Sequence, residues 1–261
     1  MEVHHHPHLP HGKKIKEYLL EFLMIFLAVT LGFFAESYRE YSLEKSRAKQ
    51  YAASLVHDLE KDTAMVGVGI MNMTYINARI DSLSLLLKSN KIERLTNVQL
   101  FAYTNFGCQY RPYTWSRASL DEIKSSGSLR YFDNDSIIMK ISAYDALTKH
   151  LDEDFSGDVE RNDRVSQKRN GIVDENYGLA DSVITWKTTP DSIMRIVLQN
   201  RHLNNEPDLS LLTNNTNDIK SLMNDYLNIR ENLYVRGKVE LPLLISKARE
   251  LIFLLKKNYH L

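Results

Sequence analysis

Cysteine, glycine and proline are scarce in this chain of 261 residues. The single cysteine, Cys108, excludes an intrachain disulfide. It lies among aromatic residues with no histidine nearby in the sequence, which predicts a buried, inert thiol and not a catalytic one. The 10 glycines and 6 prolines are too few for the many tight turns of an all-β protein, so they favour a helical fold.

An excess of charge of either sign is also absent. Lysine and arginine together number 33, and so do aspartate and glutamate, so the formal net charge is zero. The two signs are interspersed, as at Glu40, Glu44 and Lys45. Because nucleic-acid binding needs a concentrated basic surface, we expect no nucleic-acid partner.

Motifs that carry known chemistry are missing as well. The sequence has no His-Glu-x-x-His, no phosphate-binding glycine-rich loop, no Gly-x-Ser-x-Gly and no Cys-x-x-Cys. The polar groups that begin at His57 and His150 are interpreted as solvated helix faces and not as metal sites. The sequence therefore predicts no catalytic residue and no cofactor.

One long hydrophobic run is present, at 18–35, and its only charged residue is Glu21. Eighteen helical residues span about 27 Å, close to the thickness of a bilayer core, about 30 Å. The run is apolar on every face of a helix, and Glu21 lies near one end, where its carboxylate can reach the interface. A membrane anchor is therefore favoured over a cleaved signal peptide and over a buried or interfacial helix, which remain alternatives.

Basic residues flank this run unequally. Lys13, Lys14 and Lys16 lie just before it, whereas Arg39 is the nearest basic residue after it. The positive-inside rule then predicts a cytoplasmic N-terminus and a periplasmic main domain at a bacterial inner membrane. The expected organisation is a disordered cytoplasmic tail at 1–14, a single transmembrane helix at 15–36 and a helical extracytoplasmic domain at 37–261.

Five histidines crowd the first eleven residues: His4, His5, His6, His8 and His11. Clustered imidazoles can bind zinc, nickel or copper. Two prolines, Pro7 and Pro10, prevent these histidines from sharing one helix face. A disordered tail with pH-dependent charge near lipid head groups is the favoured interpretation, and metal binding by the five histidines is the weaker alternative.

Beyond the run, apolar residues recur every three or four positions almost to the end of the sequence. This pattern predicts an all-α fold, in which a single N-terminal transmembrane helix is followed by an antiparallel helical bundle with long helices. The first helix is expected to continue from the anchor into the domain, with a weak point or turn at Gly67 and Gly69. The apolar stripes are interpreted mainly as intramolecular core, with a coiled-coil homodimer as the alternative.

Capping and helix-breaking residues mark the expected boundaries. Ser119 and Glu122 form a capping-box pattern that predicts a short helix ending at Gly127, unless Thr114 caps a longer one. Three further signals concern the later helices. Residues 133–135 are expected to start a helix that reaches Tyr177, with a possible break at Gly157. Pro190 is expected to start another helix, which ends at 204–207. Gly237 and Pro242 are expected to kink or break the last helix.

The most distinctive segment is 114–130, Thr-Trp-Ser-Arg-Ala-Ser-Leu-Asp-Glu-Ile-Lys-Ser-Ser-Gly-Ser-Leu-Arg. It supplies two of the three candidate ligand or partner contacts, which are Arg111, Trp115 and Arg117. Together with Tyr110, Tyr113, Asp121 and Glu122, these residues form the site of our alternative hypothesis, an enzyme or a ligand-binding protein.

This segment, the run Glu-Phe-Leu-Met-Ile-Phe-Leu-Ala-Val-Thr-Leu-Gly-Phe-Phe-Ala-Glu at 21–36 and the histidine-rich start resemble uncharacterised single-pass membrane proteins of Gram-negative bacteria. The resemblance covers the first sixty residues and roughly 114–145, and it implies a topology but no reaction. The first hypothesis is a membrane-anchored, non-enzymatic interaction, scaffold or sensor-like module. Its expected partners are the lipid bilayer and either another protein or further copies of itself.

Overall fold

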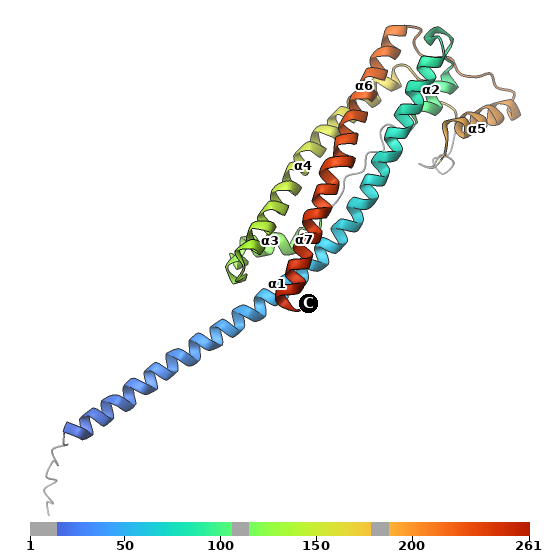
Figure 1. Ribbon diagram of the computed structural model, residues 1–261. Coiled ribbons are helices and arrows are strands. Elements are labelled where there is room, and N and C mark those ends of the chain that lie inside the picture. Colours follow the sequence, from blue (N-terminus) through green and yellow to red (C-terminus); the bar gives the residue numbers. More distant parts are fainter. Residues whose placement is uncertain (1–14, 106–114, 179–187) are drawn as a thin grey trace, which may run out of the picture. The chain divides into compact units, whose positions relative to one another are not determined.

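The computed structural model describes residues 15–105, 115–178 and 188–261, and every element in these ranges is helical (Figure 1). The α-helices are α1 (Ile15–Ser89), α2 (Asn97–Thr104), α3 (Ala118–Ser125), α4 (Asp135–Asn170), α5 (Pro190–Leu203), α6 (Thr216–Val235) and α7 (Leu241–Tyr259). Two short 3-10 helices, η1 (Ile92–Arg94) and η2 (Ser128–Tyr131), and a π-helical segment, η3 (Arg236–Glu240), complete the elements. The predicted all-α class is confirmed.

The chain divides into two compact units, one ending at Tyr51 and the other comprising Ala52–Leu261. The described part of the first unit is the beginning of α1. None of its most apolar 18-residue window is buried, and the mean hydropathy of that window is 2.1. The one hydroxyl in its centre, Thr30, donates to the carbonyl of Phe26 at 2.7 Å, so this polar group is satisfied within the helix. This part of α1 is long and apolar enough to cross a membrane.

The second unit is an antiparallel bundle of long helices. Side-chain contacts between α4 and the α6–α7 segment run in opposite order along the two. Their ribbons lie side by side in Figure 1. The contacting pairs are Asn134–Asn258, Lys140–Glu250 and Lys168–Asp225. The later part of α1 is antiparallel to α6 and α7 too, through Glu60–Lys256 and Asp81–Arg230. The predicted architecture of the bundle is therefore confirmed.

The core consists of the apolar stripes that the sequence indicated. Along α1 they are Ala52, Leu55, Leu59, Val66, Met73, Ile76, Ile80 and Leu83, and along α7 they are Leu241, Leu244, Ala248, Leu251 and Leu255. Residues of α4 and α6, such as Ile141 and Tyr226, complete the same core. Burying one large aliphatic side chain stabilises the fold by about 1.5–3 kcal/mol, so these stripes hold the helices together.

Two expected interruptions do not occur. The turn predicted at Gly67 and Gly69 is wrong, because α1 passes through both positions. Glycine costs a helix about 1 kcal/mol relative to alanine, and the buried Val66 and Met73 on either side outweigh that cost. The break predicted at Gly157 is also absent, since α4 is continuous to Asn170, and the predicted extension of this helix to Tyr177 is wrong.

The junction of α6 and α7, where a kink or break was predicted, is a π-helical segment and not a break. The chain stays helical through η3, whose wider turn shifts the apolar stripe of α6 into the phase of α7. Gly237 lies against Met73 of α1, where an added Cβ atom would make an ordinary van der Waals contact of 3.5 Å with the Cβ atom of Met73. Pro242 lies in the first turn of α7, where a missing N–H does least harm.

The remaining boundaries follow their local sequence. Helix α5 begins at Pro190 with Thr189 as its N-cap and ends at Leu203, as predicted. Gly127 follows α3 with φ +69°, the left-handed conformation that the predicted C-cap requires. Helix α2 carries a capping box that the sequence analysis missed, in which the Thr96 side chain accepts from the Gln99 amide.

Candidate functional site

The candidate contact residues Trp115 and Arg117 meet on the surface of α4. The Trp115 indole Nε1 donates to Asp152 Oδ1 at 2.5 Å, and Arg117 Nη1 donates to Asp152 Oδ2 at 2.7 Å. Arg117 also donates to the hydroxyl of Thr148 at 3.0 Å. One carboxylate thus receives both candidate side chains, which fixes the segment before α3 against α4. Four other predicted site positions, Tyr110, Arg111, Tyr113 and the capping alternative Thr114, lie outside the described residues.

The N-terminus of α3 is capped by α1. The Ser116 amide donates to Asp62 Oδ1 at 2.7 Å, and the Ser119 amide donates to Asp58 Oδ2 at 3.3 Å. The predicted capping box at Ser119 is wrong, because α3 begins at Ala118 and leaves Ser119 inside its first turn. Two carboxylates take the exposed amides instead, which suits the positive end of the helix dipole. Asp58 consequently has a structural role that its sequence neighbourhood did not indicate.

Asp62 is the most buried acid of this corner, with 3% of its surface exposed. Its second oxygen accepts a hydrogen bond of 3.0 Å from the hydroxyl of Tyr144 on α4. Burial raises the pKa of Asp62, and the hydrogen bonds from Ser116 and Tyr144 oppose that rise without cancelling it. Burial and the nearby Asp62 also raise the pKa of Tyr144, so this phenol remains a donor. The three groups tie α1, the start of α3 and α4 together.

Asp145 is the acid on which the basic residues of the same corner converge. Lys124 from α3 pairs with its carboxylate, and Lys149 lies 3.1 Å away on α4. Burial acts to raise the pKa of Asp145, but the hydrogen bonds from the two lysines together outweigh it, so the pKa is lowered. The hydrogen bond to Asp145 also raises the pKa of Lys124. The predicted site members Asp121 and Glu122 are exposed, and the charge of Asp121 contributes to the raised pKa of Lys124.

A second cluster lies where η3 meets α4. His150, Asp154 and Glu240 offer possible metal-ligand atoms within 4.8 Å of one another. The largely buried Arg236 already occupies this place, since its Nη1 lies 2.5 Å from Asp154 and 2.7 Å from Glu240. A cation bound there would face the guanidinium charge at close range. The cluster therefore works as an ion-pair network that holds the π-helical segment to α4.

Arg236 reaches one acid more. Its Nη2 donates to Asp158 at 3.0 Å, and both of these side chains are more than nine-tenths buried. Three carboxylates thus share one guanidinium across the helix interface. The predicted solvated face that begins at His150 keeps Asp152 and Asp154 partly exposed, although both carboxylates are engaged in ion pairs. Asp158, one turn further along α4, is buried.

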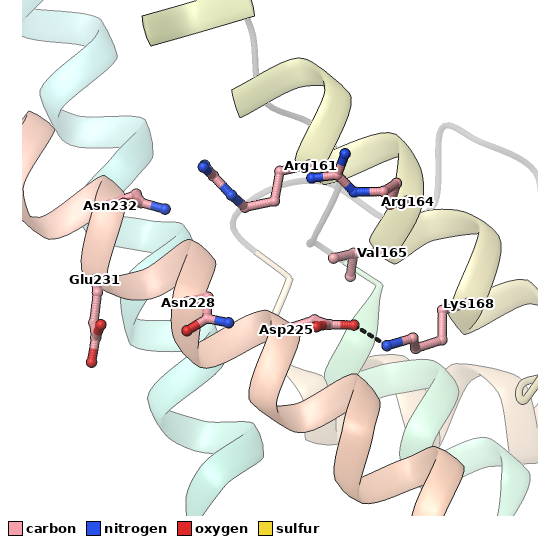
Figure 2. Close-up of a pocket in the computed structure, with 8 residues that line it drawn as sticks. All are labelled: Arg161, Arg164, Val165, Lys168, Asp225, Asn228, Glu231 and Asn232. Carbon is pink, nitrogen blue, oxygen red and sulfur yellow. Dashed lines mark hydrogen bonds and ion pairs between the residues drawn. The ribbon is translucent and has the colours of Figure 1, made fainter. Parts of the chain in front are cut away.

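A polar groove of about 480 Å³ separates α4 from α6 (Figure 2). Its lining comprises Arg161, Arg164, Val165 and Lys168 from α4 and Asp225, Asn228, Glu231 and Asn232 from α6. Each basic group has an acidic partner: Arg161 binds Asp158 at 2.8 Å, Arg164 binds Glu160 at 2.5 Å and Lys168 pairs with Asp225. This groove was not predicted from the sequence, although the spacing of the three basic residues, three and four positions apart, places them on one helix face.

The groove is open and almost wholly polar, with Val165 as its only apolar lining residue. Small-molecule sites are typically concave and mostly apolar, with a few convergent polar groups. A ligand here would also have to displace the ion pairs that join Lys168 to Asp225 and Arg161 to Asp158. The groove is thus better suited to solvent than to a tightly bound small molecule.

The histidines His4, His5, His6, His8 and His11 and the thiol Cys108 lie outside the described residues, so the predictions for them stay predictions. Glu21 lies on α1 within the exposed apolar window, near its first turns, as the sequence indicated. No protein-family model, characterised protein or solved structure matches this chain.

Proposed function

We propose that this protein is a membrane-anchored, non-enzymatic helical module whose function is to bind another protein chain. The observation that carries the proposal is the difference in burial between the two parts of α1. Its first part is an exposed apolar helix, and its later part supplies a full stripe of the bundle core. A lipid bilayer would cover the apolar first part, which no described residue covers.

The proposed topology is a single-pass protein of a bacterial inner membrane, with a cytoplasmic N-terminus and a periplasmic bundle. The three lysines before the apolar run, Lys13, Lys14 and Lys16, support this orientation against the single nearby Arg39. The resemblance of the run and of the 114–130 segment to single-pass membrane proteins supports it as well.

The non-enzymatic character is supported by the roles of the ionisable groups. Catalytic acids and bases need access to a substrate. The hydrogen bonds of Asp62, Arg117 and Arg236 instead join one helical segment to another. A bundle fixed by such cross-links is a rigid support for surface contacts. This is the property that an interaction or scaffold module needs.

The anchor is tested by placing charge in the middle of the apolar window. In the double variant Phe26→Arg/Leu27→Arg, each arginine costs insertion about 2.5–3.5 kcal/mol, and we expect the full chain to leave the alkali-resistant membrane fraction. The matched control is Tyr38→Arg/Leu43→Arg, which adds the same charge on exposed positions beyond the window and should stay with the membrane. Wild-type protein that washes off in alkali would overturn the anchor.

Orientation is tested with reporter enzymes fused to the C-terminus of the full chain. A reporter that works only outside the cytoplasm should be active, and one that works only inside should be silent. The opposite pattern would reverse the proposed topology without affecting the anchor itself.

A further inference from the structure

The outer face of α1 in the second unit carries a second, exposed heptad stripe. Its members recur at alternating spacings of four and three: Ala64, Val68, Met71, Tyr75, Ala78, Ser82 and Leu85. All of them are exposed except the half-buried Ser82, and Val68, Met71 and Leu85 expose 52%, 47% and 66% of their surface. We call these seven residues the outer seam.

The outer seam is distinct from the stripe that α1 gives to the bundle. Core residues such as Val66, Met73, Ile76 and Ile80 lie on the opposite face of the same helix, two positions out of step with the seam. A surface helix normally has one apolar stripe and a polar remainder. Helix α4 follows this rule, since its only large exposed hydrophobic residues are Met139 and Val159. The second stripe of α1 therefore exceeds what the bundle requires.

An alternating spacing of three and four over three heptads is the pattern by which one helix packs on another. We propose that the outer seam is the surface on which two copies of this chain pair, through a parallel, in-register coiled coil of their α1 helices. The inference deepens the proposed function by naming the partner, and it rests on the membrane anchor for the orientation of the two copies.

The membrane anchor is the reason to expect a second copy of the chain as the partner, with its α1 helix parallel to the first. Copies in one bilayer carry their spans in the same orientation, and the same number of residues separates span and seam in each. Equal residues then face each other across a two-fold axis, which is the usual geometry of homodimers. Confinement to the bilayer also raises the effective concentration, so a seam with two alanines and a serine is sufficient.

Charge does not oppose this pairing. The residues flanking the seam are Glu60, Gly67, Thr74 and Asp81 on one side and Met65, Asn72, Arg79 and Leu86 on the other. In a parallel in-register pair, none of the flanking positions that meet carries two like charges. The acids Glu60 and Asp81 are moreover paired within their own bundle, with Lys256 and Arg230. At Gly67 an added Cβ would meet nothing within 4 Å, so this flank is open to a neighbouring helix.

The apolar window offers a separate observation that agrees with a second copy. Ala28 and Gly32 are four residues apart, the small-xxx-small spacing that lets helices approach closely in lipid. A Cβ added at Gly32 would meet nothing within 4 Å. Since α1 is the one candidate span in the described residues, a helix that packs on Ala28 and Gly32 in the bilayer would come from another chain.

Disulfide cross-linking of the full chain in its membrane tests the proposal. In a Cys108→Ser background, Met71→Cys and Ala78→Cys each place a thiol at the inner position of a parallel pair, where equal residues lie within disulfide range. We expect both to form dimers of the chain with itself under mild oxidation. The exposed Met139→Cys on α4 is the matched control and should remain monomeric.

A second variant separates pairing from folding. Adding Val68→Glu to Met71→Cys places two carboxylates against each other and should lower the cross-linked fraction at least about tenfold, or about 1.4 kcal/mol. Met139→Glu should leave it unchanged. Membrane-bound protein without the Met71 or Ala78 cross-link, or a cross-link to a different protein, overturns the proposal while the anchor stands. Release of the wild-type protein by alkali would instead contradict the membrane anchor, so failure of the anchor and failure of the pairing are distinguishable.

Discussion

Removing Arg236 should destabilise the bundle more than any change to a surface ion pair. In Arg236→Met, Asp158 keeps only 8% of its side chain exposed and loses its guanidinium, and Asp154 and Glu240 lose theirs. Breaking a buried ion pair by removing one partner costs about 3–5 kcal/mol. Domains of this kind are stable by about 5–15 kcal/mol in total, so a large part of the stability is lost.

Asp158 keeps one partner in the variant, because Arg161 Nη1 lies 2.8 Å from its carboxylate. We therefore expect a loss toward the lower end of the range of about 3–5 kcal/mol.

Denaturation of the full chain in mild detergent, followed by far-UV circular dichroism, measures this loss. Arg236→Lys should lose less than the methionine variant, since it keeps a charge but not the fork that reaches three carboxylates. Arg164→Met is the matched control. Its pair with Glu160 is exposed on both sides, and its loss should be at most about 1 kcal/mol. Equal losses for the two methionine variants would refute the role assigned to Arg236.

Other changes should act in opposite directions and separate the physical causes. Gly127→Ala should lower the free energy of unfolding by about 1–2 kcal/mol because φ is +69°, whereas Gly157→Ala inside α4 should raise it by about 0.5–1 kcal/mol; thermal unfolding compares the two. Asp62→Ala leaves two donors without an acceptor and should cost about 2–6 kcal/mol, and Asp62→Asn should cost much less because burial already disfavours the charge; similar losses would contradict this account. The lowered pKa of Asp145 contributes stability above the unfolded value of 3.8 that is lost as pH falls below it, so Asp145→Asn should flatten the acid limb of an unfolding curve measured against pH.

Helices were predicted correctly from the sequence where they depend on apolar periodicity alone. The stripes through Leu55, Tyr226 and Leu251 lie in the core, as their spacing predicted. Apolar residues spaced three and four positions apart share one face of a helix, and burying that face buries all of them. Local caps were predicted correctly where they are self-contained, as at Pro190 and Gly127, since their geometry needs only neighbouring residues.

Predictions failed where distant residues compete with a local signal. The predicted capping box at Ser119 does not form, because Asp62 and Asp58 of α1 accept the hydrogen bonds of the Ser116 and Ser119 amides. Gly67 did not turn the chain, because packing on both sides of it outweighs the intrinsic preference of glycine. For the candidate contacts the sequence indicated Trp115 and Arg117 as notable, but it had no means of showing that both end on Asp152.

The sequence by itself determined the all-α class, the apolar window at the start of α1 and the register of the core stripes, because each follows from periodicity and composition along one segment. The tertiary structure decided which ionisable groups are buried, that Arg236 fills the cluster around His150 and that the 64–85 stripe is left outside the bundle. Whether a stripe is core or surface depends on which other helices pack against it, and that is a property of the whole fold and not of the helix that carries it.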